Sequence, residues 1–594
     1  MKHFAALCLS MSLLCGPTFI NGQSAGLEAR RARFHDAIAA QWQYGLKTHP
    51  ELATYVGDAR YNDRLSDLSP RAIAAEEEEN RKQLALFTAI DSTGFSPEEL
   101  LNKELMIRNL RQAVEDTQLK GWEMPVDQMN GIHLELASLP TQMPFNSVKD
   151  YENYIARLHA IPEALEQTKE VMRLGLRDRL MPPKYLLEKA GDQAQGIADD
   201  TLERSPFARP ADKFPAAVPQ ADQGRLRKQI QDAIEKEVNP AYAAFARFLK
   251  QDYTPHGRLD YGMWALPNGE ALYAAAVKEE TTTNLTPAEI HEMGLKQVAE
   301  IEAEMLKLAN SLGFKDLKSF NEHIRSDRKL YATSGQQLFD LYKHYAEQMQ
   351  QKLPAWFGRQ PPTRLEVVLM DSFRAPDAVP ADYSPGTEDG SRPGRINVNE
   401  YAPEKRLLLN VEAIAYHEGI PGHHLQFSIA EGLHDLPEFR RNGSYAAYSE
   451  GWAFYSERLG REIGFYQDPY SEYGRLENEM WRSVRLVVDT GVHYKHWSRQ
   501  QMIDFFTEHT AMDAQNIATE VDRYIAWPGQ ALSYKLGQMT ILKLREEAKS
   551  QLGDQFDIRK FHDTVLEEGP LPLDVLEEHV HGWLAQQKSV AAAQ

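Results

Sequence analysis

The chain has 594 residues and a formal net charge of −20, and 26% of its residues are charged. This length exceeds what one simple hydrophobic core supports, so we expect two or more lobes. The acidic balance argues against nucleic acid and against anionic membranes as partners.

The first residues predict export from the cytoplasm. One lysine precedes an apolar run from Phe4 to Leu14, and small and polar residues come after it, as in a secretory signal. We therefore expect residues 1–24 to be removed and the protein to be periplasmic or secreted. Lipid attachment at Cys15 is the less favoured alternative, because Leu14 occupies a position where lipoprotein signals carry a small residue.

The cysteines restrict the chemistry of the mature chain. Both of them, Cys8 and Cys15, lie in the signal segment, so disulfides and thiolate metal ligands are excluded from the remainder. A metal there must be held by His, Asp or Glu. No later segment offers about 18 uninterrupted apolar residues, so no integral membrane segment is expected after signal removal. The oligomeric state is not indicated.

Helical patterns dominate the mature chain. Two capping boxes, Ser96-Pro97-Glu98-Glu99 and Thr286-Pro287-Ala288-Glu289, each place a hydroxyl at the N-cap, proline at the first helical position and glutamate at the third. Long charged helices are predicted, from the spacing of apolar residues, over residues 26–48, 70–120, 148–178, 222–250, 335–353 and 472–500.

Strand patterns are few. Arg364–Met370 and Arg395–Asn399 cluster or alternate apolar residues on either side of a Pro- and Gly-rich loop, Ala375–Gly394. The sequence therefore predicts a mostly α protein with a small sheet near the segment that carries the chemistry.

The lobes are assigned from the same patterns. We expect a helical N-terminal lobe over residues 25–285 and a catalytic lobe over residues 286–594. The segment Pro182–Pro219 is an equally acceptable linker between two lobes, because it is rich in proline and polar residues.

The segment from His417 to His424, HEGIPGHH, contains the residues that a zinc hydrolase needs. Two imidazoles hold the metal, and the glutamate after the first takes a proton from a metal-activated water. In the usual HExxH form the histidines are four residues apart, about 400° and about 6 Å along a helix, and lie on one face. Here His423 comes six residues after His417 and His424 comes seven after it, so neither pair reaches one ion from a straight helix.

Pro421 offers a way to bring the histidines together. It lacks the N–H that would bond the carbonyl of His417, and its ring clashes with that carbonyl, so the helix must bulge or break. Gly419 and Gly422 supply the backbone freedom for such a distortion. A bulge that absorbs two residues returns His423 to the HExxH position and leaves His424 facing the cleft or behind the ligands. His424 as the ligand stays open.

The third ligand is expected from a neighbouring helix. Residues Ser444–Gly460 form an aromatic-rich helix with Glu450 in its middle. A glutamate among aromatic side chains is costly to bury unless it is paired or bound to metal, so we assign Glu450 as the ligand. Glu457 lies two turns later on nearly the same face, and we assign it to support the ligands or to replace Glu450.

Three segments together resemble the bacterial family known as domain of unknown function 885: HEGIPGHHLQ, AYSEGWAFYSERLG and RYIAWPGQALSYKLG. The resemblance covers most of the mature chain. That family is similar in arrangement to helical zinc peptidases such as thimet oligopeptidase and the helical carboxypeptidases, which implies a two-lobed molecule with zinc in a deep channel. Dipeptidyl peptidase III also lengthens the HExxH spacing and keeps Gly before the second His, which favours His423 over His424.

The same resemblance suggests further site residues. Tyr534 and His493 are neutral donors of the kind that helical zinc peptidases place opposite the base, where an oxyanion develops on the scissile carbonyl. Arg523 and Arg392 are candidates to hold a substrate carboxylate bidentately. His424 is a third candidate for contact with substrate.

We therefore predict a zinc metallopeptidase of the oligopeptidase, carboxypeptidase or dipeptidase type. Zn²⁺ is held by His417, His423 and Glu450, and Glu418 is the general base that later protonates the leaving amine. A zinc amidase acting on non-peptide or cell-wall amides is the alternative, as is a secreted binding protein with a structural zinc. The sequence leaves the peptide substrate and the position of cleavage open.

Overall fold

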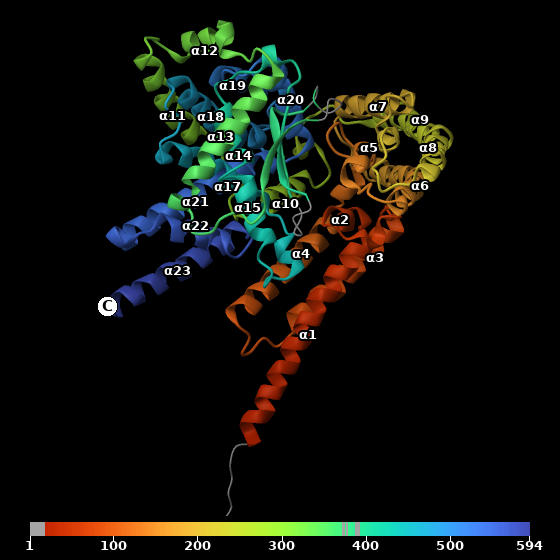
Figure 1. Ribbon diagram of the computed structural model, residues 1–594, viewed down its shortest axis with the longest axis horizontal. Coiled ribbons are helices and arrows are strands. Elements are labelled where there is room, and N and C mark those ends of the chain that lie inside the picture. Colours follow the sequence, from red (N-terminus) through yellow and green to blue (C-terminus); the bar gives the residue numbers. More distant parts are fainter. Residues whose placement is uncertain (1–17, 371–374, 376–377, 387–391, 594) are drawn as a thin grey trace, which may run out of the picture.

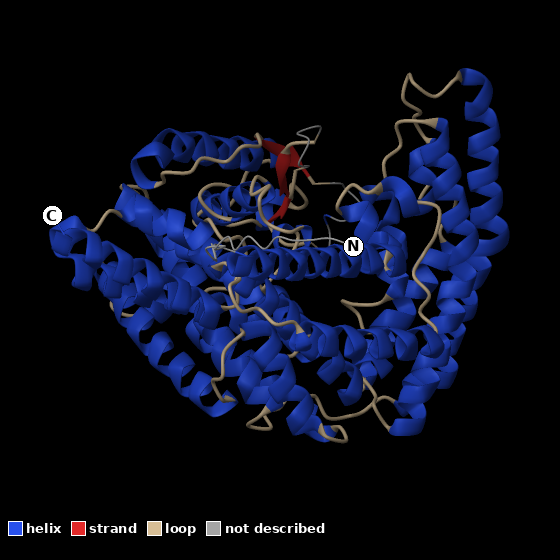
Figure 2. Cartoon of the chain, turned by 90° about the horizontal axis from the view of Figure 1, so that it is seen from below, coloured by secondary structure: helices blue, strands red, loops and turns tan. Residues whose placement is uncertain are grey.

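The structure is a computed structural model that describes residues 18–370, 375, 378–386 and 392–593. Helices form most of it, and one three-stranded sheet lies at one side (Figure 1, Figure 2). The predicted mostly α fold with a small sheet is therefore confirmed. Residues 1–17 of the expected signal, which include Cys15, lie outside the described residues.

The first part of the chain forms the helices α1 (Thr18–Thr48), α2 (Pro50–Tyr55), α3 (Pro70–Ala89), α4 (Pro97–Leu119), α5 (Ile132–Gln142), α6 (Val148–Asp178), α7 (Lys184–Asp199), α8 (Gln220–Ala233), α9 (Asn239–Arg247) and α10 (Gly269–Thr281). α1, α3 and α4 pack around Phe34 and Phe87, and α5 to α9 enclose a separate core around Tyr154 and Ile230. Figure 1 shows both groups in red to yellow, to the right of the C-terminal helices.

The second part forms the helices α11 (Pro287–Ser311), α12 (Leu317–Ser326), α13 (Gly335–Trp356), α14 (Val411–Glu418), α15 (His423–Glu431), α16 (Glu438–Arg441), α17 (Ala446–Ile463), α18 (Pro469–His493), α19 (Arg499–His509), α20 (Ala514–Ala526), α21 (Ser533–Leu552), α22 (Ile558–Leu566) and α23 (Leu573–Ala593). α10 precedes the predicted boundary at residue 285, yet its Leu272 and Val277 share a core with Leu486 and Leu532. The boundary itself stays a prediction.

Both predicted capping boxes are present. The hydroxyl of Ser96 accepts the backbone N–H of Glu99 at 3.2 Å, and the carboxylate of Glu99 accepts the N–H of Ser96 at 2.7 Å. Thr286 and Glu289 make the same reciprocal pair at 3.3 and 2.8 Å. Each box satisfies two N–H groups that a helix start leaves without partners, which fixes the first residues of α4 and α11.

Three predicted helices are interrupted, and the one over residues 472–500 ends at His493, with α19 beginning at Arg499. The segment 70–120 divides into α3 and α4, because Ser96 caps a new helix. The segment 222–250 contains a wide π-type turn at Ile234–Val238 between α8 and α9. Pro240 comes just after that turn and has no N–H for the helical ladder, which is the kind of position where a wider turn relieves the conflict.

The sheet is built from β1 (Leu365–Leu369), β2 (Ala381–Ser384) and β3 (Gly394–Val398) in the order β1-β3-β2. β1 and β3, the two predicted strands, are parallel, and β2 pairs antiparallel with β3. The prediction that all of Ala375–Gly394 is loop was wrong for β2, a four-residue edge strand whose apolar pattern is too short to register. α14 packs against β2, so the sheet borders the HEGIPGHH segment.

Among the described residues, none of the helices is long and apolar enough to cross a membrane.

Candidate metal centre

The helix that carries His417 ends one residue later. α14 stops at Glu418, α15 starts at His423, and the connection contains a cis peptide bond between Ile420 and Pro421. The backbone N–H of Gly422 donates to the carbonyl of Tyr416 at 3.0 Å. A Cβ at position 422 would lie 2.0 Å from the carbonyl oxygen of His417, so only glycine fits this turn. The expected distortion at Pro421 is therefore a complete break and not a bulge.

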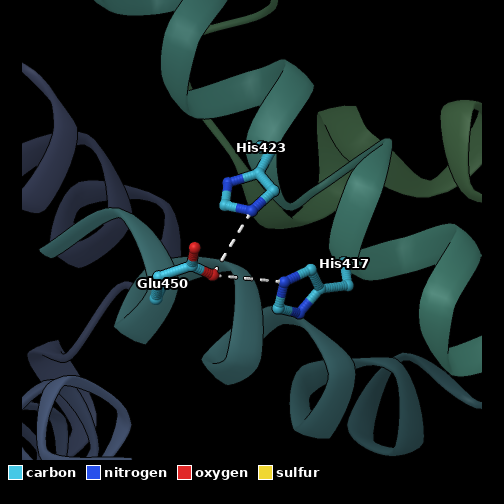
Figure 3. A group of neighbouring side chains, drawn as sticks. All are labelled: His417, His423 and Glu450. Atoms are coloured by element: carbon cyan, nitrogen blue, oxygen red, sulfur yellow. Dashed lines mark ion pairs between the residues drawn. The ribbon is translucent and has the colours of Figure 1, made fainter. Parts of the chain in front are cut away.

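The break brings His417 and His423 to one carboxylate (Figure 3). The Nε2 atoms of His417 and His423 each lie 3.5 Å from Oε2 of Glu450, and one ligand atom from each residue lies within 4.8 Å of the others. Donor atoms bound tetrahedrally to zinc at about 2.1 Å lie about 3.4 Å apart. The three side chains therefore have the spacing and the chemistry of a set of zinc ligands.

The three side chains are mostly shielded from solvent, with exposed fractions of 4% for His417, 12% for His423 and 22% for Glu450. Burial alone would raise the pKa of Glu450, but hydrogen bonds from His417 and His423 hold it well below the usual range. Burial opposes the charged form of His417, yet Glu450 and Glu457 raise its pKa to about 10. The centre thus attracts positive charge strongly, as a cation site must.

Glu457 holds His417 from the far side of the ring. Its Oε1 lies 2.8 Å from Nδ1 of His417, and its Oε2 accepts the amide of Asn478 at 3.0 Å. The side chain of Glu457 is 1% exposed and lies 3.5 Å from Arg482. Because Glu457 uses Nδ1, the ring presents Nε2 to Glu450. The predicted supporting role fits this placement, and Glu450, not Glu457, is the carboxylate that both imidazoles face.

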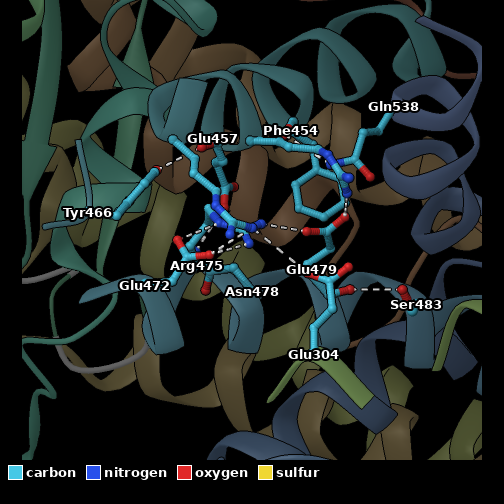
Figure 4. Close-up of polar contacts among 12 residues, drawn as sticks. Glu304, Phe454, Glu457, Tyr466, Glu472, Arg475, Asn478, Glu479, Ser483 and Gln538 are labelled. Carbon is cyan, nitrogen blue, oxygen red and sulfur yellow. Dashed lines mark hydrogen bonds and ion pairs between the residues drawn. The ribbon is translucent and has the colours of Figure 1, made fainter. Parts of the chain in front are cut away.

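A buried network of charges lies beneath this contact (Figure 4). Glu479 accepts Arg475 at 2.6 Å, Arg458 at 2.9 Å and Lys535 at 3.1 Å, which ties α17, α18 and α21 together. Burial would raise the pKa of Glu479, but Lys535 and the two arginines hold it well below its usual range. Breaking one member of such a network leaves an unpaired charge, so the network fixes α17, the helix that carries both Glu450 and Glu457.

α17 and α21 cross with their backbones in contact. A Cβ at Gly537 would lie 1.9 Å from the carbonyl oxygen of Ala447, and one at Gly451 would lie 2.4 Å from the Cα of Gly537. Gly451 is the residue after Glu450 in the sequence, so this crossing positions the carboxylate. These glycines are not among the residues predicted from the sequence, although an isolated glycine within a helical pattern is a known sign of close packing.

Glu418 lies beside the three ligand residues. Burial raises its pKa, and the charges of Glu450 and Asp382 raise it further, whereas His417 and His423 lower it. Asp382 belongs to β2, so the unpredicted edge strand contributes to the electrostatics of the predicted base.

His424 points away from the ligand residues. Its Nδ1 lies 3.0 Å from the hydroxyl of Tyr383, and its Nε2 lies 3.1 Å from the carbonyl of Thr363. Burial lowers the pKa of His424 to about 4, so the ring is neutral with both nitrogens engaged. The structure therefore brings His423, and not His424, to Glu450, and it leaves no ring nitrogen of His424 for a substrate.

The two predicted oxyanion donors have different surroundings. The hydroxyl of Tyr534 accepts Arg523 at 3.1 Å and Gln530 at 3.4 Å, and the side chain keeps some exposure. His493 is 2% exposed; its Nδ1 accepts the N–H of Met263, and its Nε2 lies 2.9 Å from the carbonyl of Tyr524. Burial lowers the pKa of His493 to about 3. Both ring nitrogens serve the backbone, so the assignment of His493 as a donor to substrate has no support here.

The two candidate carboxylate anchors also differ. Arg523 lies next to Tyr534, with its side chain 16% exposed. Arg392 precedes β3, where it donates to the carbonyl of Gly386 at 3.5 Å. Burial raises the pKa of Tyr55 in α2 and of Tyr383 in β2, and the positive charge of Arg392 offsets part of that rise in both. Arg392 therefore lies where the N-terminal helices approach the sheet.

Comparison with known proteins places the chain in a family. The profile described as "Bacterial protein of unknown function (DUF885)" matches residues 50–580. The crystal structure of a putative lipoprotein from Colwellia psychrerythraea is 28% identical and superimposes with a TM-score of 0.89, over 94% of this chain and 100% of that one.

A second solved structure shares the fold. It is a putative lipoprotein of unknown function from Shewanella oneidensis, 18% identical, with a TM-score of 0.69 over 92% of this chain and 99% of that one. Among curated proteins, none matches the chain. Since the family profile covers most of the sequence, the chain belongs to the bacterial DUF885 family.

Proposed function

We propose that this protein is a zinc-dependent hydrolase of peptide bonds. The observation that carries the proposal is the arrangement of two imidazole nitrogens around one carboxylate oxygen, each 3.5 Å from it, with Glu418 directly after the first histidine. Two histidines and one carboxylate are a ligand set that catalytic zinc sites use, and three protein ligands leave a fourth position for water. His424 supplies no fourth ligand, because both its nitrogens bind elsewhere.

The bound metal would supply Lewis acidity, which lowers the pKa of a water and polarises a carbonyl. Beside such a metal, Glu418 would accept a proton from the attacking water and return it to the leaving amine; the water's oxygen would bond to the carbonyl carbon, and the C–N bond would then break. A glutamate whose pKa is raised by burial suits both roles, because it is a stronger base than an exposed one and a competent acid afterwards.

Tyr534 is the proposed donor to the developing oxyanion. Its hydroxyl oxygen accepts hydrogen bonds from Arg523 and Gln530, so its own proton is free to be donated. A neutral donor held in place by two neighbours needs little reorganisation when charge develops on the substrate.

An extracytoplasmic location accompanies this proposal. The N-terminal segment resembles a secretory signal, and the two similar solved structures are described as putative lipoproteins. A soluble exported form and a form anchored through Cys15 differ only in how that segment is processed.

The test combines metal analysis with a mixed peptide library. Purified protein should contain about one zinc per chain, cleave peptides, lose cleavage in chelator and regain it with Zn²⁺. Glu418→Gln should keep the zinc and lose cleavage. Zinc bound at one per chain without cleavage of any peptide would instead indicate a structural site, and cleavage of non-peptide amides alone would indicate an amidase.

A further inference from the structure

Three arginines converge on Tyr534. The guanidinium carbon of Arg485 lies 4.4 Å from the centre of the Tyr534 ring, and that of Arg482 lies 6.0 Å from it. Nη2 of Arg523 lies 3.1 Å from the hydroxyl oxygen. Arg485 and Arg482 come from α18 and Arg523 comes from α20, so two separate helices bring their positive charges to one phenol.

The carboxylates near these arginines do not balance their charge. Glu520 serves two of them, with Arg485 at 3.1 Å and Arg523 at 3.8 Å. Arg482 has Glu457 at 3.5 Å, and that carboxylate also binds His417. Among the described residues, three guanidinium groups therefore share two carboxylates, one of which belongs to the metal centre. A surplus positive charge away from water is unfavourable unless an anion joins it.

The hydrogen bonds of these buried arginines are also incomplete. Arg482 is 6% exposed and Arg485 is 2% exposed, so both are almost fully buried. Nε and Nη1 of Arg482, and Nη1 of Arg485, are buried without a hydrogen-bond partner in the part of the chain that the structure describes. The ring of Trp481 covers both guanidinium groups, at 4.4 and 4.5 Å, but a ring face accepts no full hydrogen bond and carries no net charge.

The cluster reaches solvent at Arg523 and Tyr534, and it adjoins the metal centre. The side chain of Arg523 is 16% exposed and Tyr534 is 8% exposed. Phe454, one turn after Glu450 on α17, lies 5.3 Å from the guanidinium carbon of Arg482. The accessible edge of the positive cluster thus lies next to the proposed oxyanion donor.

We propose that Arg523, with the charge of Arg482 and Arg485 behind it, binds the C-terminal carboxylate of a substrate peptide. The inference rests on the proposed function and narrows it to removal of the last residue. One residue of extended chain spans about 3.5 Å. The hydroxyl of Tyr534, the proposed oxyanion donor, lies 3.1 Å from Nη2 of Arg523, so the two groups are adjacent and would bind a carbonyl and a carboxylate that are close together in the substrate. A planar guanidinium also suits a carboxylate better than an ammonium does.

The test measures binding without turnover. Zinc-loaded Glu418→Gln protein is titrated, by calorimetry, with N-acetyl-trialanine and with its C-terminal amide, which differ only in the terminal charge. The free acid should bind at least tenfold more tightly than the amide, a difference of about 1.4 kcal/mol. Equal affinity for the two peptides would overturn the inference, whatever the effect of substitutions at Arg523.

Substitutions test whether Arg523 causes the difference in affinity between the acid and the amide. Arg523→Gln, made in the same background, should bind acid and amide alike, and Arg523→Lys should restore part of the preference. Arg461→Gln is the matched control, because Arg461 is 60% exposed and pairs with Glu472 outside the cluster; it should keep the full preference. A preference that survives Arg523→Gln would place the carboxylate elsewhere, for example on the metal, and would also overturn the inference.

Failure of this inference can be distinguished from failure of the proposed peptidase function. Absence of zinc or of any peptide cleavage in the unsubstituted protein contradicts the peptidase. Cleavage of amidated peptides at internal bonds contradicts only the terminal-carboxylate inference. Thermal unfolding would reveal whether Arg523→Gln folds. If it does not, the inference is still tested by the affinities of the Glu418→Gln protein for acid and amide, and by which products the unsubstituted protein releases.

Discussion

Nδ1 of His417 lies 2.8 Å from Oε1 of Glu457, and the opposite nitrogen of the same ring faces Glu450. The carboxylate fixes the ring and makes the imidazole a stronger donor. We expect Glu457→Gln to weaken zinc binding by about 10- to 100-fold, measured by competition with a chelating dye. Glu462→Gln is the control, because Glu462 lies on the same helix and pairs with Arg545; unchanged zinc affinity in Glu457→Gln would contradict the supporting role.

Replacing the base should separate metal binding from catalysis. Glu418→Gln keeps the shape of the side chain but cannot accept a proton from water. We expect one zinc per chain to remain and the rate of peptide cleavage to fall by about 10² to 10⁴. Zinc content by atomic absorption and cleavage of a fluorogenic peptide provide the two measurements, and a rate close to that of the parent protein would exclude Glu418 as the base.

The neighbouring histidines should behave differently. His423→Ala removes a nitrogen that lies 3.5 Å from Glu450, so we expect loss of stoichiometric zinc at micromolar metal. His424→Ala instead breaks contacts to Tyr383 and Thr363, which costs about 1–3 kcal/mol of stability but leaves the ligands in place. Zinc titration and thermal unfolding of both variants distinguish the effects. The reverse pattern would mean that His424 is the ligand.

The crossing of α17 and α21 should tolerate no side chain. Gly537→Ala places a Cβ 1.9 Å from the carbonyl of Ala447, so the helices must separate, at a cost of about 1–3 kcal/mol. Because Glu450 is on α17, zinc affinity should fall as well. Gly582→Ala is the control: nothing lies within 4 Å of a Cβ there, and a helical alanine should stabilise by up to about 1 kcal/mol. Equal stability of the two variants, by chemical unfolding, would contradict the close crossing.

Glu477 should give the protein a measurable pH dependence. Burial raises its pKa from 4.5 to about 7, against smaller opposing effects of the Ala511 N–H and Arg325. Between these values the folded protein holds a proton that the unfolded chain releases, so the free energy of unfolding falls as the pH rises. Glu477→Gln should remove this contribution and be more stable than the parent at pH 8. Thermal unfolding of metal-free samples at about pH 4.5 and pH 8 tests this; identical slopes for both proteins would refute it.

The sequence predicted the elements whose signals are local. Capping at Ser96 and Thr286, the strands β1 and β3, and the aromatic-rich helix around Glu450 depend on residues within a few positions of each other, and the structure contains them all. The family was also predicted from three short segments, and the profile match confirms it. In the candidate site, the choice of His423 over His424 rested on a proline that no straight helix accepts.

What the sequence could not supply depends on contacts between distant segments. Arg482 and Asn478 resemble any polar residues of an amphipathic helix until α17 brings Glu457 against them. The surroundings of His493 depend on distant segments too, because its ring nitrogens lie against the backbone of Met263 and Tyr524. Strand β2 is four residues long, too few for periodicity to distinguish it from loop.

The break between Glu418 and His423 affects how such centres are recognised. The distance between the two imidazoles is set by a four-residue turn, so it is not tied to the 3.6-residue period of a helix. A sequence search for two histidines four residues apart, as in HExxH, therefore passes over this protein. A search of coordinates for converging nitrogen and oxygen atoms finds it, and would group it with proteins whose histidine spacing differs.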